Sequence, residues 1–429
     1  LFDSFGAPSV YSGRSYFLLY SVAISMSKTI IIIGAGLAGL SAALQAAENG
    51  CNVKLVSSLP SERAQSVMAE GGINAALNTK DENDSPEEHF TDTIKAACGL
   101  ADPNAVWGMT QAAPELVHWL LKLGVKFNMS GYDDVDLRNF GGQKKKRTAF
   151  AQSDTGKQIM TAMIDAVRRK EASGMVERFS HHSFLTLRLC GNICCGCVIR
   201  DEYSQETVEL PGDAVIVATG GMHGLFGNTT GSLSNTGEVT AELFRLGVPL
   251  ANGEMIQYHP TTVKCGGKRM LISEAARGEG GRLFAMKDGK QWYFMEEKYP
   301  ELGNLMPRDI TAREIWKVSH ESEVFLDMTE ISEEIISNKL SGLADDCMTY
   351  LHKDIRKEPV SVLPGIHYFM GGILVDEQHR TPIQNLYAAG ECCAQYHGAN
   401  RLGGNSLLGA LYGGRVAAKS ACEQADVVD

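Results

Sequence analysis

Histidine and arginine side chains recur in five short segments of the second half of the chain. His259 lies in QYHPTT, Arg277 in SEAARGEGG, Arg308 in MPRDITARE, His367 in GIHYFMGG and Arg401 in HGANRLGGNS. Each stands beside glycine, proline or small residues, which predicts a loop rather than a helix face. Arginine offers bidentate donors and histidine a directional one, so the set suits a dicarboxylate site. Taken singly, His259 is equally well explained as a buried structural histidine and Arg308 as a surface ion pair.

A glycine-rich turn near the start of the chain is typical of nucleotide binding. Gly34, Gly36 and Gly39 follow a β-branched run in the pattern G-x-G-x-x-G. In this pattern Gly34 makes a tight turn, Gly36 lets a pyrophosphate approach, and Gly39 allows close packing of helix on strand. A tight turn that binds nothing is the alternative. Ser57 stands where an acidic residue commonly bonds to a ribose, and its hydroxyl can make a weaker bond of the same kind.

Strands and helices must position these residues. Residues 29–33 predict a buried parallel strand, an alanine-rich helix is expected to about residue 48, and residues 51–56 predict the second strand of a βαβ unit. Residues 214–221 and 385–391 predict further buried strands that end on glycine turns. One nucleotide-binding domain assembled from distant segments is therefore expected.

The domain boundaries follow from composition. Residues 26–249 and 363–423 are expected to form the nucleotide-binding domain, and the more charged residues 250–362 an inserted domain that sits over the nucleotide. Residues 1–25 are interpreted as an upstream extension in preference to a signal peptide, because a strand follows immediately.

Composition excludes several classes of protein. The 429 residues are 44% hydrophobic and carry a net charge of −11, with no basic stripe for nucleic acid. The run Lys144–Arg147 is expected to be a solvated loop. No apolar run is long enough to span a membrane. Length and composition thus indicate an ordinary globular protein of two or three domains.

The eleven cysteines do not form a disulfide framework, and their adjacent pairs suit a reducing compartment. Cys190, Cys194, Cys195 and Cys197 lack the C-x-x-C spacing of an iron–sulfur site. We expect a hairpin turning at residues 191–192, with Cys195 and Cys197 facing the core beside isoleucines, and no metal site.

The ordered motifs resemble a known family. IIIGAGLAGLSAA, AEGGINAAL, FGGQKKKRTAFAQSDTG, VATGG, QYHPT, SEAARGEGG, PRD, HYFMGG and HGANRLGGNSLLGALYGG match the flavoprotein subunit of succinate dehydrogenase and fumarate reductase across about residues 27–420. L-aspartate oxidase is a close relative of this family. The resemblance implies an α/β fold, in which a Rossmann-like FAD-binding domain carries an inserted α+β capping domain. It also implies an FAD-dependent enzyme that interconverts fumarate and succinate.

The resemblance assigns roles residue by residue. The FAD residues it implies are Gly34, Gly36, Gly39, Ser57, Arg63, Gln65, Gly71, Gly72, Glu238, Glu391, Ser406 and Leu407. The substrate residues it implies are His259, Ser273, His367 and Arg401, with Phe140 packing nearby. Arg308 would deliver the proton, with Glu274 and Arg277 as a relay to solvent. Ser273 replaces the family's usual threonine, and Glu238 its usual aspartate.

Gln65 departs from the family in a way that bears on the chemistry. It stands where the family commonly carries a histidine bonded covalently to the flavin. An amide cannot form that bond, so FAD is expected to bind non-covalently. Loss of the covalent link lowers the flavin potential, and we therefore expect fumarate reduction to be favoured.

The resemblance also bears on partners and location. The sequence ends at Asp429, before the helical C-terminal domain that the family usually carries. An iron–sulfur electron-transfer subunit is a candidate partner. We expect a cytoplasmic protein, or one held at the inner face of the membrane through such a partner. An L-aspartate oxidase-like or other enoate-reducing flavoenzyme and a non-catalytic flavin-binding electron-transfer subunit remain the alternative functions.

Overall fold

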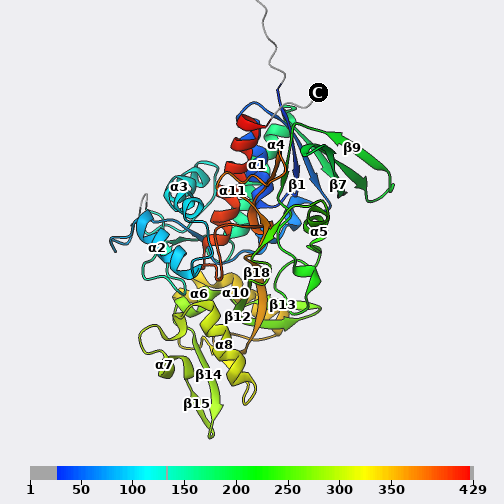
Figure 1. Ribbon diagram of the computed structural model, residues 1–429. Coiled ribbons are helices and arrows are strands. Elements are labelled where there is room, and N and C mark those ends of the chain that lie inside the picture. Colours follow the sequence, from blue (N-terminus) through cyan, green and yellow to red (C-terminus); the bar gives the residue numbers. More distant parts are fainter. Residues whose placement is uncertain (1–26, 132–133, 426–429) are drawn as a thin grey trace, which may run out of the picture.

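The computed structural model describes residues 27–131 and 134–425, so the extension predicted for residues 1–25 lies outside the described residues. A five-stranded sheet forms the centre of the larger part of the molecule (Figure 1). All its strands are parallel, in the order β20 (Leu386–Ala388), β10 (Ala214–Val217), β1 (Thr29–Ile33), β2 (Asn52–Ser57) and β6 (Val176–Ser180). The predicted α/β class and the strands assembled from distant segments are confirmed.

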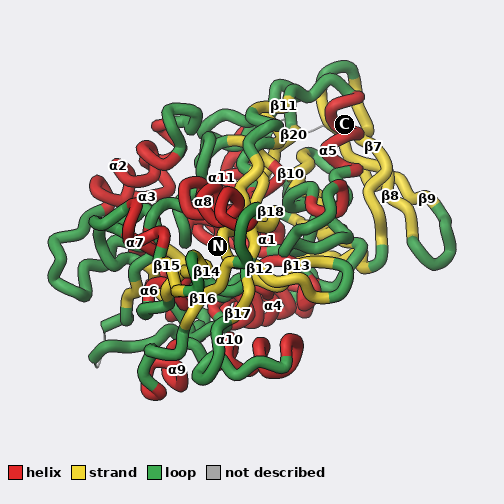
Figure 2. Tube along the Cα trace, turned by 90° about the horizontal axis from the view of Figure 1, so that it is seen from below, coloured by secondary structure: helices red, strands yellow, loops and turns green. Residues whose placement is uncertain are grey.

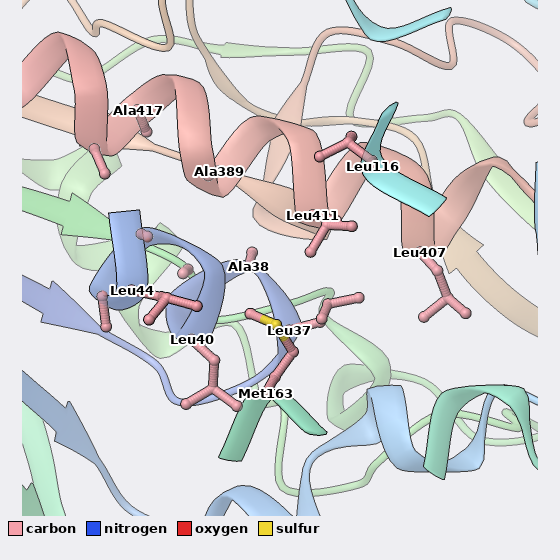
Figure 3. Packing of buried hydrophobic residues seen from close by; sticks show 14 of the residues in the cluster. Leu37, Ala38, Leu40, Leu44, Leu116, Met163, Ala389, Leu407, Leu411 and Ala417 are labelled. Carbon is pink, nitrogen blue, oxygen red and sulfur yellow. The ribbon is translucent and has the colours of Figure 1, made fainter. Parts of the chain in front are cut away.

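Apolar side chains cover both faces of this sheet, as its near-continuous β-branched strands require. On one face pack α1 (Leu37–Glu48), α3 (Pro103–Lys122), α4 (Thr155–Ala172) and α11 (Asn405–Gln424). Figure 3 shows Ala38 of α1 on the side of Leu411 of α11, and Leu40 on the side of Met163 of α4. On the other face lies an antiparallel sheet of β7 (His182–Cys190), β8 (Ile193–Asp201) and β9 (Thr207–Pro211), with α5 (Glu238–Arg245) beside it.

A second group of elements occupies the lower part of Figure 1 and surrounds its own apolar cluster. One sheet joins β13 (Lys268–Leu271), β12 (Ile256–Cys265) and β18 (Leu363–Phe369). Another joins β15 (Lys290–Trp292), β14 (Arg282–Lys287), β16 (Val324–Asp327) and β17 (Val360–Ser361). The helices here are α6 (Glu274–Gly278), α7 (Phe294–Lys298), α8 (Arg308–Ser319), α9 (Glu333–Lys339) and α10 (Ser341–Asp346). In Figure 2, α8 is seen beside β12 and β18.

Short elements complete the described chain. They are α2 (Pro86–Ala96), β3 (Ile73–Asn74), β4 (Leu137–Arg138), β5 (Thr148–Ala149), β11 (Leu250–Ala251), β19 (Gly372–Leu374) and β21 (Cys393–Ala394). In the part of the chain that the structure describes, no helix combines the length and apolarity needed to cross a membrane. Nor does any cluster of three or more His, Cys, Asp or Glu side chains among these residues form a metal site.

Arg147 corrects the expectation of a solvated loop at Lys144–Arg147. Its side chain is fully buried, with Nη2 2.8 Å from Asp84 Oδ1 and Nη1 2.9 Å from Asp92 Oδ2. Asp92 lies on α2 and Asp84 just before it, so the pairs tie this helix to β5. Removing one partner of a buried pair leaves an uncompensated charge, which makes Arg147 a structural residue.

The cysteine hairpin turns at residues 191–192 as predicted, but the predicted face is wrong at one position. Cys194 and Cys197 enter the apolar cluster, whereas Cys195 does not. The reason is a register shift: Arg188 pairs with Gly196 and Leu189 with Cys194. Cys195 is therefore the extra residue of a β-bulge, which reverses the alternation of side chains along the strand.

Candidate functional site

A cavity of about 640 Å³ opens at the carboxyl ends of β1 and β10, where the connections leave the sheet in opposite directions. This is the place in an open parallel sheet where ligands bind. The cavity is continuous from Ser57 and the glycine loop at one end to His259 and Arg401 at the other. One elongated ligand and one small ligand can therefore lie in contact within it.

The structure brings the predicted FAD residues together around one end of this cavity. Those that line it are Gly34, Gly36, Ser57, Arg63, Gln65, Gly71, Gly72, Glu238, Glu391, Ser406 and Leu407. Gly39 does not line it. A Cβ at Gly39 would lie 1.8 Å from the carbonyl oxygen of Gly34, so this glycine allows α1 to pack against the turn.

The residues at this end fit a dinucleotide. Gly36 leaves the entrance of α1 open, with no protein atom within 3.8 Å of a Cβ built there. The Oγ of Ser57 is buried and has no hydrogen-bond partner among the residues that the structure describes. A buried hydroxyl without a partner is costly, and a ligand hydroxyl would satisfy it.

Gly71 has a packing role that the sequence analysis did not foresee. A Cβ at Gly71 would come within 2.6 Å of the Phe140 ring. The buried ring thus lies directly on the glycine, and both line the cavity. Phe140 is therefore part of the cavity wall beside Gly71.

Two histidines face each other at the other end. His259 on β12 and His367 on the neighbouring strand β18 have ring centroids 5.0 Å apart. Burial, followed by the positive charge of Arg308, holds the pKa of both rings well below the ordinary value of 6.5. Both rings are therefore neutral at physiological pH.

The tautomers of these rings follow from their neighbours. Thr230 Oγ1 lies 2.8 Å from Nδ1 of His367 and can donate to it. The amide of Thr261 lies 3.3 Å from Nδ1 of His259, although the Thr261 carbonyl competes at 3.1 Å. Nε2 of His259 is buried without a partner. When both Nδ1 atoms accept, each Nε2–H is free to donate to a ligand.

Arg401 supplies a buried positive charge beside the histidines. Its guanidinium lies 4.5 Å from the centre of the Tyr368 ring, and its Nε has no partner. Burial, reinforced by the nearby charge of Arg308, lowers the pKa of Arg401 to about 9. A buried cation with unused donors is suited to binding a carboxylate.

Arg308, Glu274 and Arg277 form a buried chain of charges. Arg308 donates to Glu274 Oε2 through Nε at 2.8 Å and Nη2 at 2.6 Å. Arg277 Nη2 lies 3.3 Å from Glu274 Oε1. Burial opposes ionisation of Glu274, but the charges of Arg308 and Arg277 prevail and its pKa lies below 4.5. Arg308 and Glu274 line the cavity, and Arg277 stands behind Glu274.

Most of these residues lie on regular elements, which corrects the prediction of loops. His259 and His367 lie on strands, Arg308 is the first residue of α8, and Ser273 caps α6 by accepting from the amide of Ala275 at 3.4 Å. Arg401 lies in a loop, just before α11. The flanking glycines and prolines mark the ends of these elements, where side chains can point into a cavity.

Sequence reasoning missed several residues of the site. Gln257 accepts from Arg308 Nη1 at 3.1 Å, and the amide of Gly141 donates to Glu274 at 2.9 Å. Gln257 stands two residues before His259, so the period of a strand could have placed it on the same face. Glu70 and Asp346 also line the cavity, and no local pattern marks them.

Comparison with known proteins gives a consistent picture. A family model described as an FAD binding domain matches residues 29–407. The chain is similar to the succinate dehydrogenase flavoprotein subunit of Bacillus subtilis (strain 168), with 44% identity over 402 residues, covering 92% of this chain and 69% of that one. It is 34% identical over 407 residues to L-aspartate oxidase of Streptomyces coelicolor, covering 92% of this chain and 68% of that one.

Among solved structures, the chain is similar to a quinol fumarate reductase flavoprotein, FrdA, of E. coli. The TM-score is 0.86 at 31% identity, and the match covers 93% of this chain and 70% of that one. The likeness therefore extends over both groups of elements and the cavity between them.

Proposed function

The chain belongs to the FAD-binding oxidoreductase family of these succinate dehydrogenase and fumarate reductase flavoprotein subunits, and we propose that it interconverts fumarate and succinate. The observation that carries the proposal is the single cavity. The glycine loop of a dinucleotide site and a buried set of two neutral histidines and two arginines line the same space.

The residues around the glycine loop hold FAD, which supplies the hydride donor and acceptor when bound. The open entrance of α1 receives the pyrophosphate, since helix N-termini bind anions. Ser57 provides a hydroxyl for the ribose, and Glu391, Ser406 and Leu407 also line the cavity. Residues 26–249 and 363–423 form the domain that binds FAD, and residues 250–362 form the cap.

The substrate carboxylates are bound by neutral and charged donors. His259 and His367 donate through Nε2–H, Ser273 through its hydroxyl, and Arg401 through its guanidinium. Neutral histidines orient a carboxylate without adding to the positive charge of a buried site that already holds two arginines. Phe140 excludes water from the face where the two ends of the cavity meet.

Arg308 carries the proton to the substrate. An arginine is a weak acid in water, so the step requires a strongly basic carbon, produced when two bound carboxylates polarise the alkene. Glu274 accepts from Arg308 and is itself held by Arg277 and by the amide of Gly141. Glu274 and Arg277 thus return a proton to Arg308 after each turnover.

The conservative substitution Arg308→Lys tests this role. It retains a positive charge but loses the two-atom contact with Glu274. We expect fumarate-dependent oxidation of a reduced dye to fall at least about 100-fold in kcat, with a small change in KM. Arg313→Lys, at an exposed position of the same helix, is the matched control. Retention of activity by Arg308→Lys and Arg308→Ala would remove Arg308 from the mechanism.

The same assay separates the alternative functions. An L-aspartate oxidase-like enzyme would oxidise aspartate. With such an enzyme, addition of fumarate would not cause oxidation of the reduced dye. A non-catalytic electron-transfer subunit would bind flavin, turn over neither substrate and show no response to Arg308→Lys. The buried charges around Glu274 favour a catalytic protein. A subunit that only transfers electrons would require none of these charges.

Gln65 lines the cavity. Its amide cannot form the covalent link to flavin that a histidine can form, so we propose that FAD binds non-covalently and that fumarate reduction is favoured. Acid precipitation of the purified protein should leave the flavin in the supernatant, and Gln65→His should retain part of it in the pellet. A redox titration gives the direction. A flavin potential well above that of the fumarate/succinate couple would contradict the reductive assignment. We propose an iron–sulfur electron-transfer subunit as a partner of this chain.

A further inference from the structure

Two cysteines that are far apart in the sequence meet on the side of the central sheet where α1 and α11 pack. Cys51 stands in the turn between α1 and β2, and Cys422 lies in the last turn of α11. Their Sγ atoms are 2.8 Å apart. Cys51 is buried, whereas Cys422 is partly exposed. Neither residue contributes to the cavity, and the proposed reaction uses neither.

The backbones that carry the two sulfurs are fixed relative to each other. The hydroxyl of Ser41 on α1 donates to the carbonyl of Leu411 on α11 at 2.7 Å. A Cβ at Gly414 would lie 2.3 Å from the carbonyl oxygen of Ala38, so the two helices are in close backbone contact (Figure 3). Lys28 Nζ donates to the carbonyl of Cys422 at 2.8 Å. The sulfurs therefore meet without any rearrangement of the fold.

The surroundings also favour the reactive form of one sulfur. The hydrogen bond between the two sulfurs has the largest influence and lowers the pKa of Cys51, and the ammonium group of Lys28 acts in the same direction. Burial and the carboxylate of Asp213 oppose them without reversing the shift. A thiolate, rather than a thiol, attacks peroxides and disulfides.

We propose that Cys51 and Cys422 are a redox-sensitive pair, which a hydroperoxide converts into a disulfide and a thiol reductant restores. One sulfur attacks the hydroperoxide, the O–O bond breaks, and the sulfur becomes a sulfenic acid as alcohol or water leaves. The second sulfur displaces water from the sulfenic acid and the S–S bond forms. Two thiols are thereby oxidised and one hydroperoxide is reduced, with the two thiol protons leaving in the alcohol and water.

The disulfide would join the first βαβ unit to the last helix. The two residues are separated by 371 positions, so the bond closes nearly the whole described chain into one loop. Cross-links that close long loops restrict the unfolded chain most. The first turn of α11 carries Ser406 and Leu407, which line the cavity, so the bond also holds that helix against α1.

Peptide mapping of the purified full chain tests the proposal. The protein is treated with hydrogen peroxide, remaining thiols are blocked, and the non-reducing digest is examined by mass spectrometry. We expect one cross-linked peptide pair containing Cys51 and Cys422, lost on addition of dithiothreitol. The oxidised protein should unfold about 3–5 °C higher than the reduced protein. Cys51→Ser and Cys422→Ser should abolish both effects, whereas Cys98→Ser, at an exposed cysteine, should retain both.

Three results would overturn the proposal. They are the absence of the cross-linked pair under conditions that oxidise Cys98, a cross-link that joins other cysteines, and an unchanged unfolding temperature after the Cys51–Cys422 bond has formed. Fumarate-dependent activity of Cys51→Ser and Cys422→Ser is measured in parallel and should match that of the unmodified protein. The proposal does not rest on the proposed function, because peptide mapping and thermal unfolding report on the pair directly.

Discussion

Glu70 is a carboxyl group whose surroundings disfavour its charge. Its Oε2 is fully buried without a partner, next to Gly71 on the cavity wall. Burial, reinforced by the nearby Asp346 and Asp154, raises its pKa from 4.5 to about 8. The folded protein therefore binds more protons than the unfolded chain between these pH values. The contribution of this group to stability is therefore fully present below about pH 4.5 and is lost as the pH rises to about 8.

Substitution of Glu70 by glutamine checks this linkage. The amide cannot ionise, so Glu70→Gln should unfold at higher urea concentration than the parent protein at pH 8.5, with a gain of about 2–4 kcal/mol. At pH 4.5 the two proteins should be nearly equal. Glu48→Gln, at an exposed position, is the matched control. A gain that is the same at both pH values would argue against an ionisable Glu70.

The sequence predicted which residues belong to the site better than it predicted the residues that contact them. The two histidines and the arginines of the site were identified from their flanking sequence, and the structure places them around one cavity. Gln257 and Glu70 were missed because their roles depend on burial and on residues distant in the sequence. The burial of Arg147 was missed for the same reason, since Asp84 and Asp92 lie more than fifty positions before it.

At the scale of elements, two glycines in the turn from β1 to α1 have different roles. One is needed for folding and the other for cofactor binding. Gly34 has φ +113°, and a Cβ there would lie 2.3 Å from the carbonyl oxygen of Ala218. Gly36 has φ −79°, and the nearest protein atom to a Cβ there is 3.8 Å away. Gly34 is required by its backbone conformation and by its contact with the Ala218 carbonyl. Gly36 is required only by a ligand bound in front of α1.

Two alanine substitutions therefore have different consequences. Gly36→Ala should fold with a stability within about 1 kcal/mol of the parent and bind FAD at least about 10-fold more weakly. Gly34→Ala should not accumulate as folded protein. Circular dichroism and flavin content of the purified proteins are the measurements. Full flavin occupancy in Gly36→Ala would show that the pyrophosphate lies elsewhere.

The βαβ unit was predicted almost to the residue because a β-branched run, three glycines and an alanine-rich helix all agree locally. The hairpin carrying Cys195 was predicted, but its bulge was not, because a bulge depends on the partner strand. Likewise, β12 pairs with β18 across more than ninety residues, and no local pattern announces a pairing at that separation.

At the scale of the whole molecule, a dicarboxylate would join segments that are otherwise held by separate apolar clusters. Arg401 lies in the part of the chain around the central sheet, whereas His259 and Ser273 lie with β12 and α6. A ligand bound by all three stabilises the folded state by mass action. At 100 times its dissociation constant, succinate should add about 2.7 kcal/mol to the free energy of unfolding.

Thermal unfolding with and without succinate measures this effect. Butyrate, with one carboxylate on a chain of the same length, should produce a much smaller shift. Arg401→Met should remove most of the shift caused by succinate, because it deletes the buried cation. Equal shifts with succinate and butyrate would contradict a site that binds both carboxylates.

The order of strands in the central sheet also determines when, during synthesis of the chain, the sheet can be completed. β1, near the start, is flanked in the completed sheet by β2 and β10, and the edge strand β20 comes only at Leu386–Ala388. At roughly 5–20 residues per second, a ribosome needs about 20–70 s to proceed from β1 to β20. During that time α1 has no α11 to cover it, and once β10 has been made its outer edge has no neighbour until β20 follows. The newly made chain is therefore a natural client for chaperones until its last helix emerges, and its synthesis rate and its yield are linked.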